Sequence, residues 1–120
     1  MEYISIIFIA LVAIEHIYIL VLEMFLWHKP RTQKVFGIKR DDVETTKVLA
    51  ANQGLYNGFL AAGLIWGLAH PNPVMATQIQ LFFICCVLVA ALYGGMTVKK
   101  SILIVQGLPA LLALASLLLL

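Results

Sequence analysis

Three ionisable side chains lie in the first apolar stretch of the sequence: Glu15, His16 and Glu23. A carboxyl group in such a setting can hold or exchange a proton, and an adjacent imidazole can hydrogen-bond to it. On a helix turning 100° per residue, His16 and Glu23 fall within about 40° of one another, and Glu15 lies roughly 80° from Glu23. Because ionisable groups are costly inside a membrane-spanning helix, we regard each one as a candidate functional residue.

Uncharged polar side chains recur at a similar depth in the later apolar stretches. With a rise of 1.5 Å per residue, they lie about 5–14 Å inside the boundaries that Val48, Met96 and Ser101 suggest. On the first helix, the Glu15–His16 pair lies about 16–18 Å inside the boundary at Trp27. We predict one cavity open to the cytoplasmic side, with Glu15 and His16 at its floor. Its predicted ligand-binding residues also include Glu23, Asn52, Gln53, Tyr56, Asn57, Tyr93 and Gln106.

A structural alternative exists for every one of these residues. Asn and Gln side chains in membrane helices often hydrogen-bond one helix to another. A neutral carboxylic acid bonded to the imidazole of His16 would likewise be purely structural. The sequence leaves both interpretations open.

The composition excludes an ordinary soluble domain. Hydrophobic residues make up 62% of the 120 residues and charged residues 12%, whereas a soluble domain has about 25% charged residues. A helix that crosses the hydrocarbon core needs about 20 mostly apolar residues. We therefore predict an all-α membrane protein, a four-transmembrane-helix bundle in a single domain over 1–120, with spans at about 3–27, 48–68, 78–96 and 102–120.

The positive charges fix an orientation for this bundle. All eight lysines and arginines lie in the segments 28–47 and 97–101. Since cytoplasmic loops carry the excess of Lys and Arg, we expect both segments in the cytoplasm and both termini outside. The chain is then a multi-pass protein of the cell inner (plasma) membrane with a long first cytoplasmic loop.

Short motifs predict local features of the helices. Asp41 with Glu44 three positions later has the form of a capping box, so the second helix should start near Asp41. Pro109 frees a backbone carbonyl in the preceding turn and should kink the fourth helix. The pairs Gly54-x-x-x-Gly58 and Gly63-x-x-x-Gly67 are typical of close helix packing, either within the chain or against another protomer.

The sequence offers little for a metal, a redox centre or a nucleic acid. Adjacent cysteines on a helix cannot close an unstrained disulfide, so we interpret Cys85 and Cys86 as small buried hydrophobic residues. The adjacent Glu15 and His16 lack the Glu-x-x-His spacing of bundle di-metal sites. We expect no metal, no cofactor and no nucleic-acid partner, and we attribute the basic loop to topology and anionic lipid.

Two motifs resemble a known family over essentially the whole chain. They are Ala13-Ile14-Glu15-His16 with Glu23-Met24-Phe25 and Trp27, and Asn52-Gln53-Gly54-Leu55-Tyr56-Asn57-Gly58. The chain is similar to the small bacterial membrane proteins grouped as domain of unknown function 1304. The resemblance implies an integral membrane protein and no particular activity.

Two fainter resemblances separate the functional hypotheses. Small multidrug exporters also have four spans and a glutamate in the first span, at a place similar to that of Glu15. This resemblance favours a carrier or binding protein for a small polar or cationic solute, which would work as a homo-oligomer among membrane lipids. The start of the second helix is similar to that of the membrane-associated eicosanoid and glutathione metabolism family, although the arginines for its thiol cofactor are missing. The alternative is therefore a membrane enzyme on a lipid-soluble substrate, and a third hypothesis is a structural subunit.

Overall fold

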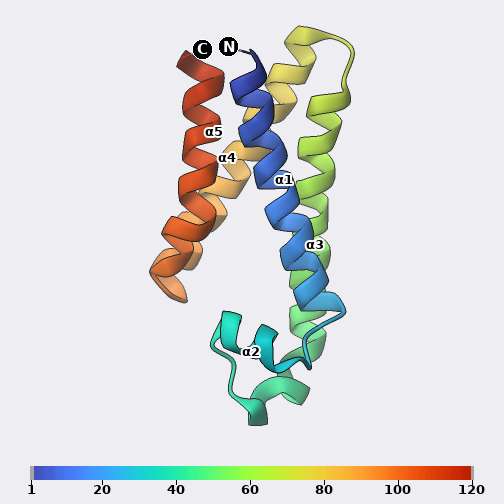
Figure 1. Ribbon diagram of the computed structural model, residues 1–120, viewed down its shortest axis with the longest axis vertical. Helices are drawn as coiled ribbons and strands as arrows, with labels where there is room; N and C mark the ends of the chain where they lie inside the picture. Colours follow the sequence, from blue (N-terminus) through green and yellow to red (C-terminus); the bar gives the residue numbers. More distant parts are fainter. Residues whose placement is uncertain (1, 120) are drawn as a thin grey trace. The chain divides into compact units, whose positions relative to one another are not determined.

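The computed structural model describes residues 2–119, and every regular element among them is helical. Figure 1 follows these helices in chain order. No strand occurs in this part of the chain, which confirms the all-α prediction. The elements are α1 (Glu2–Met24), α2 (Pro30–Phe36), the 3-10 turn η1 (Arg40–Asp42), α3 (Val43–Ala69), α4 (Pro73–Thr97), the π-helix η2 (Leu103–Gly107) and α5 (Leu108–Leu119).

The observed helices can be compared with the four predicted spans. Tyr3–Met24 and Pro73–Thr97 are long and apolar enough to cross a membrane, and the apolar helix Leu103–Leu119 is shorter. Helix α3 has the necessary length with 27 residues, but its Asn, Gln and Thr side chains make it less apolar. The structure thus confirms helices at all four places, and two of these helices are long and apolar enough to cross a membrane.

Helix α2 was absent from the prediction, although its ends follow familiar rules. Pro30 occupies the first helical position, where its missing N–H costs nothing. Gly37 ends the helix with φ 66°, in the left-handed region that glycine adopts without a steric penalty. A proline followed seven positions later by a glycine was therefore the available signal.

Helix α4 is started by its own cap. The side chain of Asn72 accepts hydrogen bonds from the backbone N–H groups of Val74 at 3.0 Å and Met75 at 3.1 Å. Pro73 follows as the first helical residue. Asn72 thus satisfies two of the N–H groups that have no partner within the helix.

The chain forms two compact units, and each has its own apolar core. Among the described residues, unit 1 holds 2–14 and 60–119, and unit 2 holds Glu15–Phe59. The single domain predicted over 1–120 stays a prediction. The core of unit 1 consists of Ile9, Val12, Ala13, Leu64, Ile84, Val87, Ala110 and Ala113.

Glycines bring helices of unit 1 close together, as their spacing predicts. A Cβ atom added at Gly63 would collide with the ring of Phe83, and one added at Gly67 would lie 2.7 Å from Cγ of Gln80. The amide of Gln80 donates a hydrogen bond to the carbonyl oxygen of Gly67 at 2.9 Å. The partner of this glycine pair is therefore a helix of the same chain.

The π-helix η2 precedes Pro109, where the sequence predicts a kink. Proline has no N–H and its ring crowds the preceding turn, so a regular α-helix cannot pass through unchanged. π-Helical segments are among the usual causes of a bend in a helix. The π-helix thus lies in the stretch where Pro109 predicts a departure from regular α-helix, and this stretch includes Gln106.

Unit 2 has a smaller core around Trp27, Val43 and Ala50. The indole N–H of Trp27 donates to Oγ1 of Thr46 at 3.1 Å, and its ring lies 5.3 Å from that of Phe36 between centroids. The end of the first helix is thereby attached both to the long loop and to the first turns of α3.

Candidate functional site

Glu23 and Asn57 form a buried carboxyl–amide pair in unit 2. Glu23 lies in the last turns of α1, and only 8% of its surface is exposed. Its Oε1 accepts a hydrogen bond from Nδ2 of Asn57 in α3 at 2.7 Å. The structure thus brings together two of the residues that the sequence proposed for a ligand site.

Gly54 explains how α3 comes so near to Glu23. A Cβ atom at Gly54 would lie 2.6 Å from Cγ of Met24 and 3.1 Å from Cβ of Glu23. The absence of a side chain therefore allows the two helices to approach each other. Since residues three apart share a helix face, Asn57 lies one turn further along the same contact.

The carboxyl group of Glu23 is only partly satisfied. No described residue forms a hydrogen bond with its second oxygen, Oε2. Glu15, eight positions earlier and about 12 Å away along the helix axis, has a buried Oε1 with no hydrogen-bond partner among residues 2–119. His16, beside it, is fully buried. Two carboxyl groups of unit 2 thus keep an oxygen that can take a proton or a cation.

The remaining predicted site residues lie in less enclosed positions. Asn52 and Gln53 are exposed on α3, and the exposed ring of Tyr56 lies 6.0 Å from that of Phe59. In unit 1, Tyr93 is 71% exposed and Gln106 is half-buried. A single cavity joining all these side chains stays a prediction.

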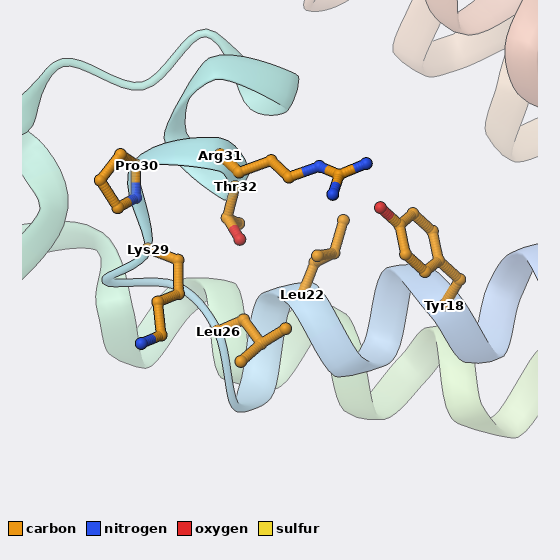
Figure 2. A pocket seen from close by; sticks show the side chains of 7 residues that line it. All are labelled: Tyr18, Leu22, Leu26, Lys29, Pro30, Arg31 and Thr32. Atoms are coloured by element: carbon orange, nitrogen blue, oxygen red, sulfur yellow. The ribbon is translucent and has the colours of Figure 1, made fainter.

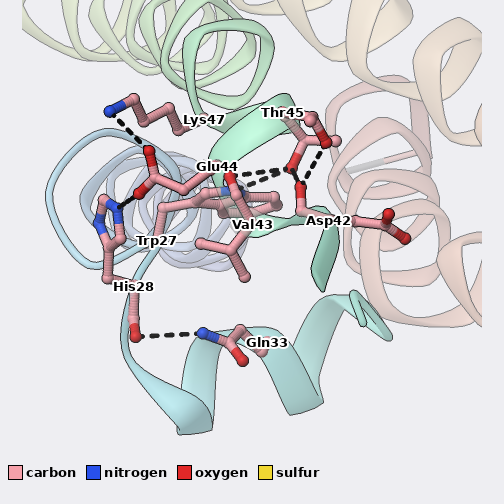
Figure 3. Close-up of polar contacts among 9 residues, drawn as sticks. Trp27, His28, Gln33, Asp42, Val43, Glu44, Thr45 and Lys47 are labelled. Atoms are coloured by element: carbon pink, nitrogen blue, oxygen red, sulfur yellow. Dashed lines mark hydrogen bonds and ion pairs between the residues drawn. The ribbon is translucent and has the colours of Figure 1, made fainter. Parts of the chain in front are cut away.

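A second polar cluster lies where the long loop meets α3 (Figure 3). Oε1 of Glu44 lies 2.9 Å from Nε2 of His28, and Oε2 lies 3.0 Å from Nζ of Lys47. The hydrogen bond from Lys47, and after it the one from His28, holds the pKa of the Glu44 carboxyl below its ordinary value. The spacing of Glu44 and Lys47 hinted at one contact, but no local pattern marks His28, 16 positions away.

This cluster corrects the predicted capping box. Glu44 uses both carboxylate oxygens on His28 and Lys47, so it does not turn back to the helix start. Asp41 lies inside the 3-10 turn that precedes Val43. The expected start of helical structure near Asp41 is right, but the capping interaction is wrong because the loop supplies a better partner for Glu44.

The cysteines lie on α4 and are free, as expected. Cys85 is exposed, so its predicted burial is wrong, whereas Cys86 is half-buried. The buried face of α4 runs through Ile84, Val87 and Ala91, and Cys85 points away from it. Among residues 2–119, no three His, Cys, Asp or Glu side chains gather where they could hold a metal ion.

The fold and the site define an all-helical protein with two helices of membrane-spanning length and a buried carboxyl–amide pair. The chain belongs to the family described as "Protein of unknown function (DUF1304)", whose sequence profile matches residues 10–118. It is 38% identical over 118 residues to the "Uncharacterized protein YpaA" of Lactococcus lactis subsp. lactis (strain IL1403), which covers 97% of this chain and 98% of the relative. No solved structure matches the chain significantly. The family resemblance of the two motifs is therefore confirmed.

Proposed function

We propose that the protein is a multi-pass inner-membrane carrier, or binding protein, for a small cationic solute. Four spans cross the membrane, the loops 28–47 and 97–101 lie in the cytoplasm, and both termini lie outside. Glu23 binds the cation and releases a proton as it does so. The observation that carries this proposal is the buried Glu23 carboxyl group, with one oxygen bonded to Asn57 and the other without a partner among the described residues.

The distribution of apolar side chains supports a membrane location. Large apolar side chains such as Ile14, Phe82, Val89 and Leu92 are more than half exposed on α1 and α4. Soluble monomers rarely expose contiguous apolar patches of this kind, whereas acyl chains solvate them well. Helix α3, with 27 residues, would be about 40 Å long. The 17-residue helix Leu103–Leu119 is at the short end of the spanning range.

The chemistry of the pair suits an exchange of proton for cation. Asn57 donates to one oxygen of Glu23 and so fixes the direction of the carboxyl group. The other oxygen can then carry a proton when the site is empty and contact the cation when it is full. Because a charge inside the membrane is costly, binding of the cation and loss of the proton are coupled. Glu15, deeper along α1, offers a second carboxyl group on the pathway.

A homo-oligomer fits this role. A chain with four helices is small for enclosing a solute by itself, so a pathway needs surfaces from more than one chain. The exposed apolar faces of the helices leave area for such contacts.

The proposal is tested with the full chain in detergent and in liposomes, with guanidinium and tetraphenylphosphonium as probe cations. We expect at least one of them to release protons on binding and to accumulate in liposomes when a pH gradient is applied. Glu23→Gln should lose both effects, whereas the same substitution at the exposed Glu44 should keep them. Unchanged proton release in Glu23→Gln would contradict the proposal.

The second candidate is a membrane enzyme on a lipid-soluble substrate, and the orientation of Glu23 by Asn57 is the observation in its favour. A carboxyl group held in one direction could act as a general acid or base. Such an enzyme would convert its substrate without any gradient. If the variants of Glu23 and Asn57 change only stability, and neither transport nor conversion is found, the pair is structural.

A further inference from the structure

A pocket of about 480 Å³ opens in unit 2 between the end of α1 and the start of α2. Its wall on the first helix is formed by Tyr18 and Leu22, and Leu26 continues it beyond the last turn. Arg31 and Thr32 of α2 form the other wall. Figure 2 shows these side chains around the opening. The pocket is thus mainly apolar on one side and carries polar groups on the other.

Thr32 is the first indication that something binds here. Only 1% of its surface is exposed, yet its hydroxyl group forms no hydrogen bond with another described residue. The hydroxyl oxygen itself keeps some accessible surface, so a ligand can reach it, and a hydroxyl group with few accessible water partners favours a hydrogen bond to such a ligand. Since Thr32 lines the pocket, its hydroxyl group could donate a hydrogen bond to an acceptor oxygen of an occupant.

Arg31 is the second indication. Its guanidinium group extends across the pocket toward the hydroxyl group of Tyr18 (Figure 2). Arg31 forms no ion pair among the residues that the structure describes. A guanidinium group binds phosphate oxygens with two parallel N–H donors, so an unpaired arginine beside two hydroxyl groups is suited to a phosphate.

We propose that this pocket is a binding site for an anionic phospholipid of the cytoplasmic leaflet. Arg31 and Thr32 bind the phosphate, Leu22 and Leu26 contact the glycerol part of the lipid, and Tyr18, deeper along the first helix, donates to an ester oxygen at the start of an acyl chain. The apolar wall distinguishes this ligand from a soluble anion. The surrounding segment 28–47 carries six Lys and Arg and three Asp and Glu residues, and such basic segments attract anionic lipids.

The site rests on the proposed membrane orientation and does not depend on the carrier activity. The experiment uses the full chain in detergent and measures its melting temperature against added phosphatidylglycerol, phosphatidylcholine with the same acyl chains, or inorganic phosphate. We expect phosphatidylglycerol to stabilise the protein at a concentration at least about fivefold lower than phosphatidylcholine, which is the effect of roughly one favourable basic contact. Inorganic phosphate alone should have little effect.

Three variants locate the site. Arg31→Gln should remove the preference for phosphatidylglycerol, whereas Lys34→Gln, which changes the net charge equally on the same helix outside the pocket, should keep it. Thr32→Val should weaken the response to phosphatidylglycerol without lowering the melting temperature in its absence, because the hydroxyl group forms no hydrogen bond with another described residue. If Arg31→Gln does not fold, Arg31→Lys replaces it and should retain the charge attraction with a weaker preference.

Three results would overturn the proposal. Equal stabilisation by the two lipids would show that the headgroup is not recognised, and equal stabilisation by inorganic phosphate would indicate a site for a soluble anion. If Lys34→Gln lost the preference for phosphatidylglycerol as completely as Arg31→Gln, the lipid would be attracted by the whole basic loop and not by this pocket. Cation-linked proton release should be unchanged in Arg31→Gln, so that failure of the lipid site and failure of the carrier proposal can be told apart.

Discussion

Leu20 occupies the space that a side chain at Gly58 would need. A Cβ atom built at Gly58 would lie 2.6 Å from Cδ1 of Leu20, and the next atom of that leucine is 4.0 Å away. The contact is therefore made by the far end of a flexible side chain. Gly63 differs, because a Cβ atom there would collide with several atoms of the Phe83 ring. The side chain that faces Gly58 can thus move aside more easily than the aromatic ring that faces Gly63 on the same helix.

This difference predicts unequal effects of the same substitution. Gly63→Ala should destabilise the protein by about 1–3 kcal/mol, because an aromatic ring in a packed contact must move as a whole. Gly58→Ala should lie within about 1 kcal/mol of the wild type, because Leu20 can change rotamer and alanine favours the helix. Thermal melts of the purified chain in detergent measure both. Equal melting temperatures for the two variants would contradict the assigned contacts.

The orientation of the chain can be tested by labelling single cysteines in intact cells. In a background with Cys85 and Cys86 replaced by alanine, a cysteine at Pro71 should react with an impermeant thiol reagent from outside. A cysteine at Val35 on α2 should react only after the membrane is opened. Pro71 is preferable to the neighbouring Asn72, because Asn72 caps α4. Labelling of the Val35→Cys variant from outside would contradict the predicted cytoplasmic location of the loop 28–47.

The pair of ion contacts around Glu44 predicts a pH dependence of stability. Since Lys47 and His28 hold the pKa of Glu44 below 4.5, the folded state prefers the ionised carboxylate. The stability that the ionised Glu44 contributes to the folded state is therefore fully present above pH 4.5. It is lost as the pH falls from there through the lowered pKa. Glu44→Gln should therefore show a smaller loss of melting temperature between neutral and acid pH than the wild type does. Asp41→Asn, at a carboxyl group without an ion pair among the described residues, is the matched control.

Much of the fold could be read from the sequence because the strong signals are local. Apolar runs marked the places of α1, α3, α4 and α5, and Pro109 marked the irregular stretch before it. The glycine spacing on α3 correctly indicated close contacts. Helix α2 was missed because only seven residues form it, which is too short for an apolar period to stand out, although Pro30 and Gly37 marked its ends.

The site was predicted less completely, because side-chain partners depend on contacts between distant positions. The burial cost of a carboxyl group drew attention to Glu23, but nothing in the sequence selected Asn57 over Asn52 or Gln53 as its partner. Gly54 makes that choice by allowing the helices to meet one turn before Asn57. For Glu44, a capping box was the best local interpretation, and His28 competes with it from 16 positions away.

Glu15 and Glu23 should respond differently when each is replaced by leucine. Oε1 of Glu15 is buried without a hydrogen-bond partner among the described residues, so Glu15→Leu removes an unsatisfied polar group and should leave the melting temperature unchanged or raise it. Glu23→Leu leaves the amide of Asn57 without its acceptor and should cost about 1–2 kcal/mol. The double variant Glu23→Leu with Asn57→Leu should recover part of that loss, because it removes both partners.

The same variants separate a functional carboxyl group from a structural one. If Glu15 serves the solute pathway, Glu15→Leu and Glu15→Gln should both abolish proton-coupled uptake of the probe cations while the protein stays folded, since the group does nothing for stability. The measurements are thermal melts in detergent and uptake into liposomes under a pH gradient, made on the same preparations. A loss of stability in Glu15→Leu as large as in Glu23→Leu would show that Glu15 has a structural partner. Full uptake by a stable Glu15→Leu variant would remove Glu15 from the pathway and leave Glu23 as the only carboxyl group of the proposed site.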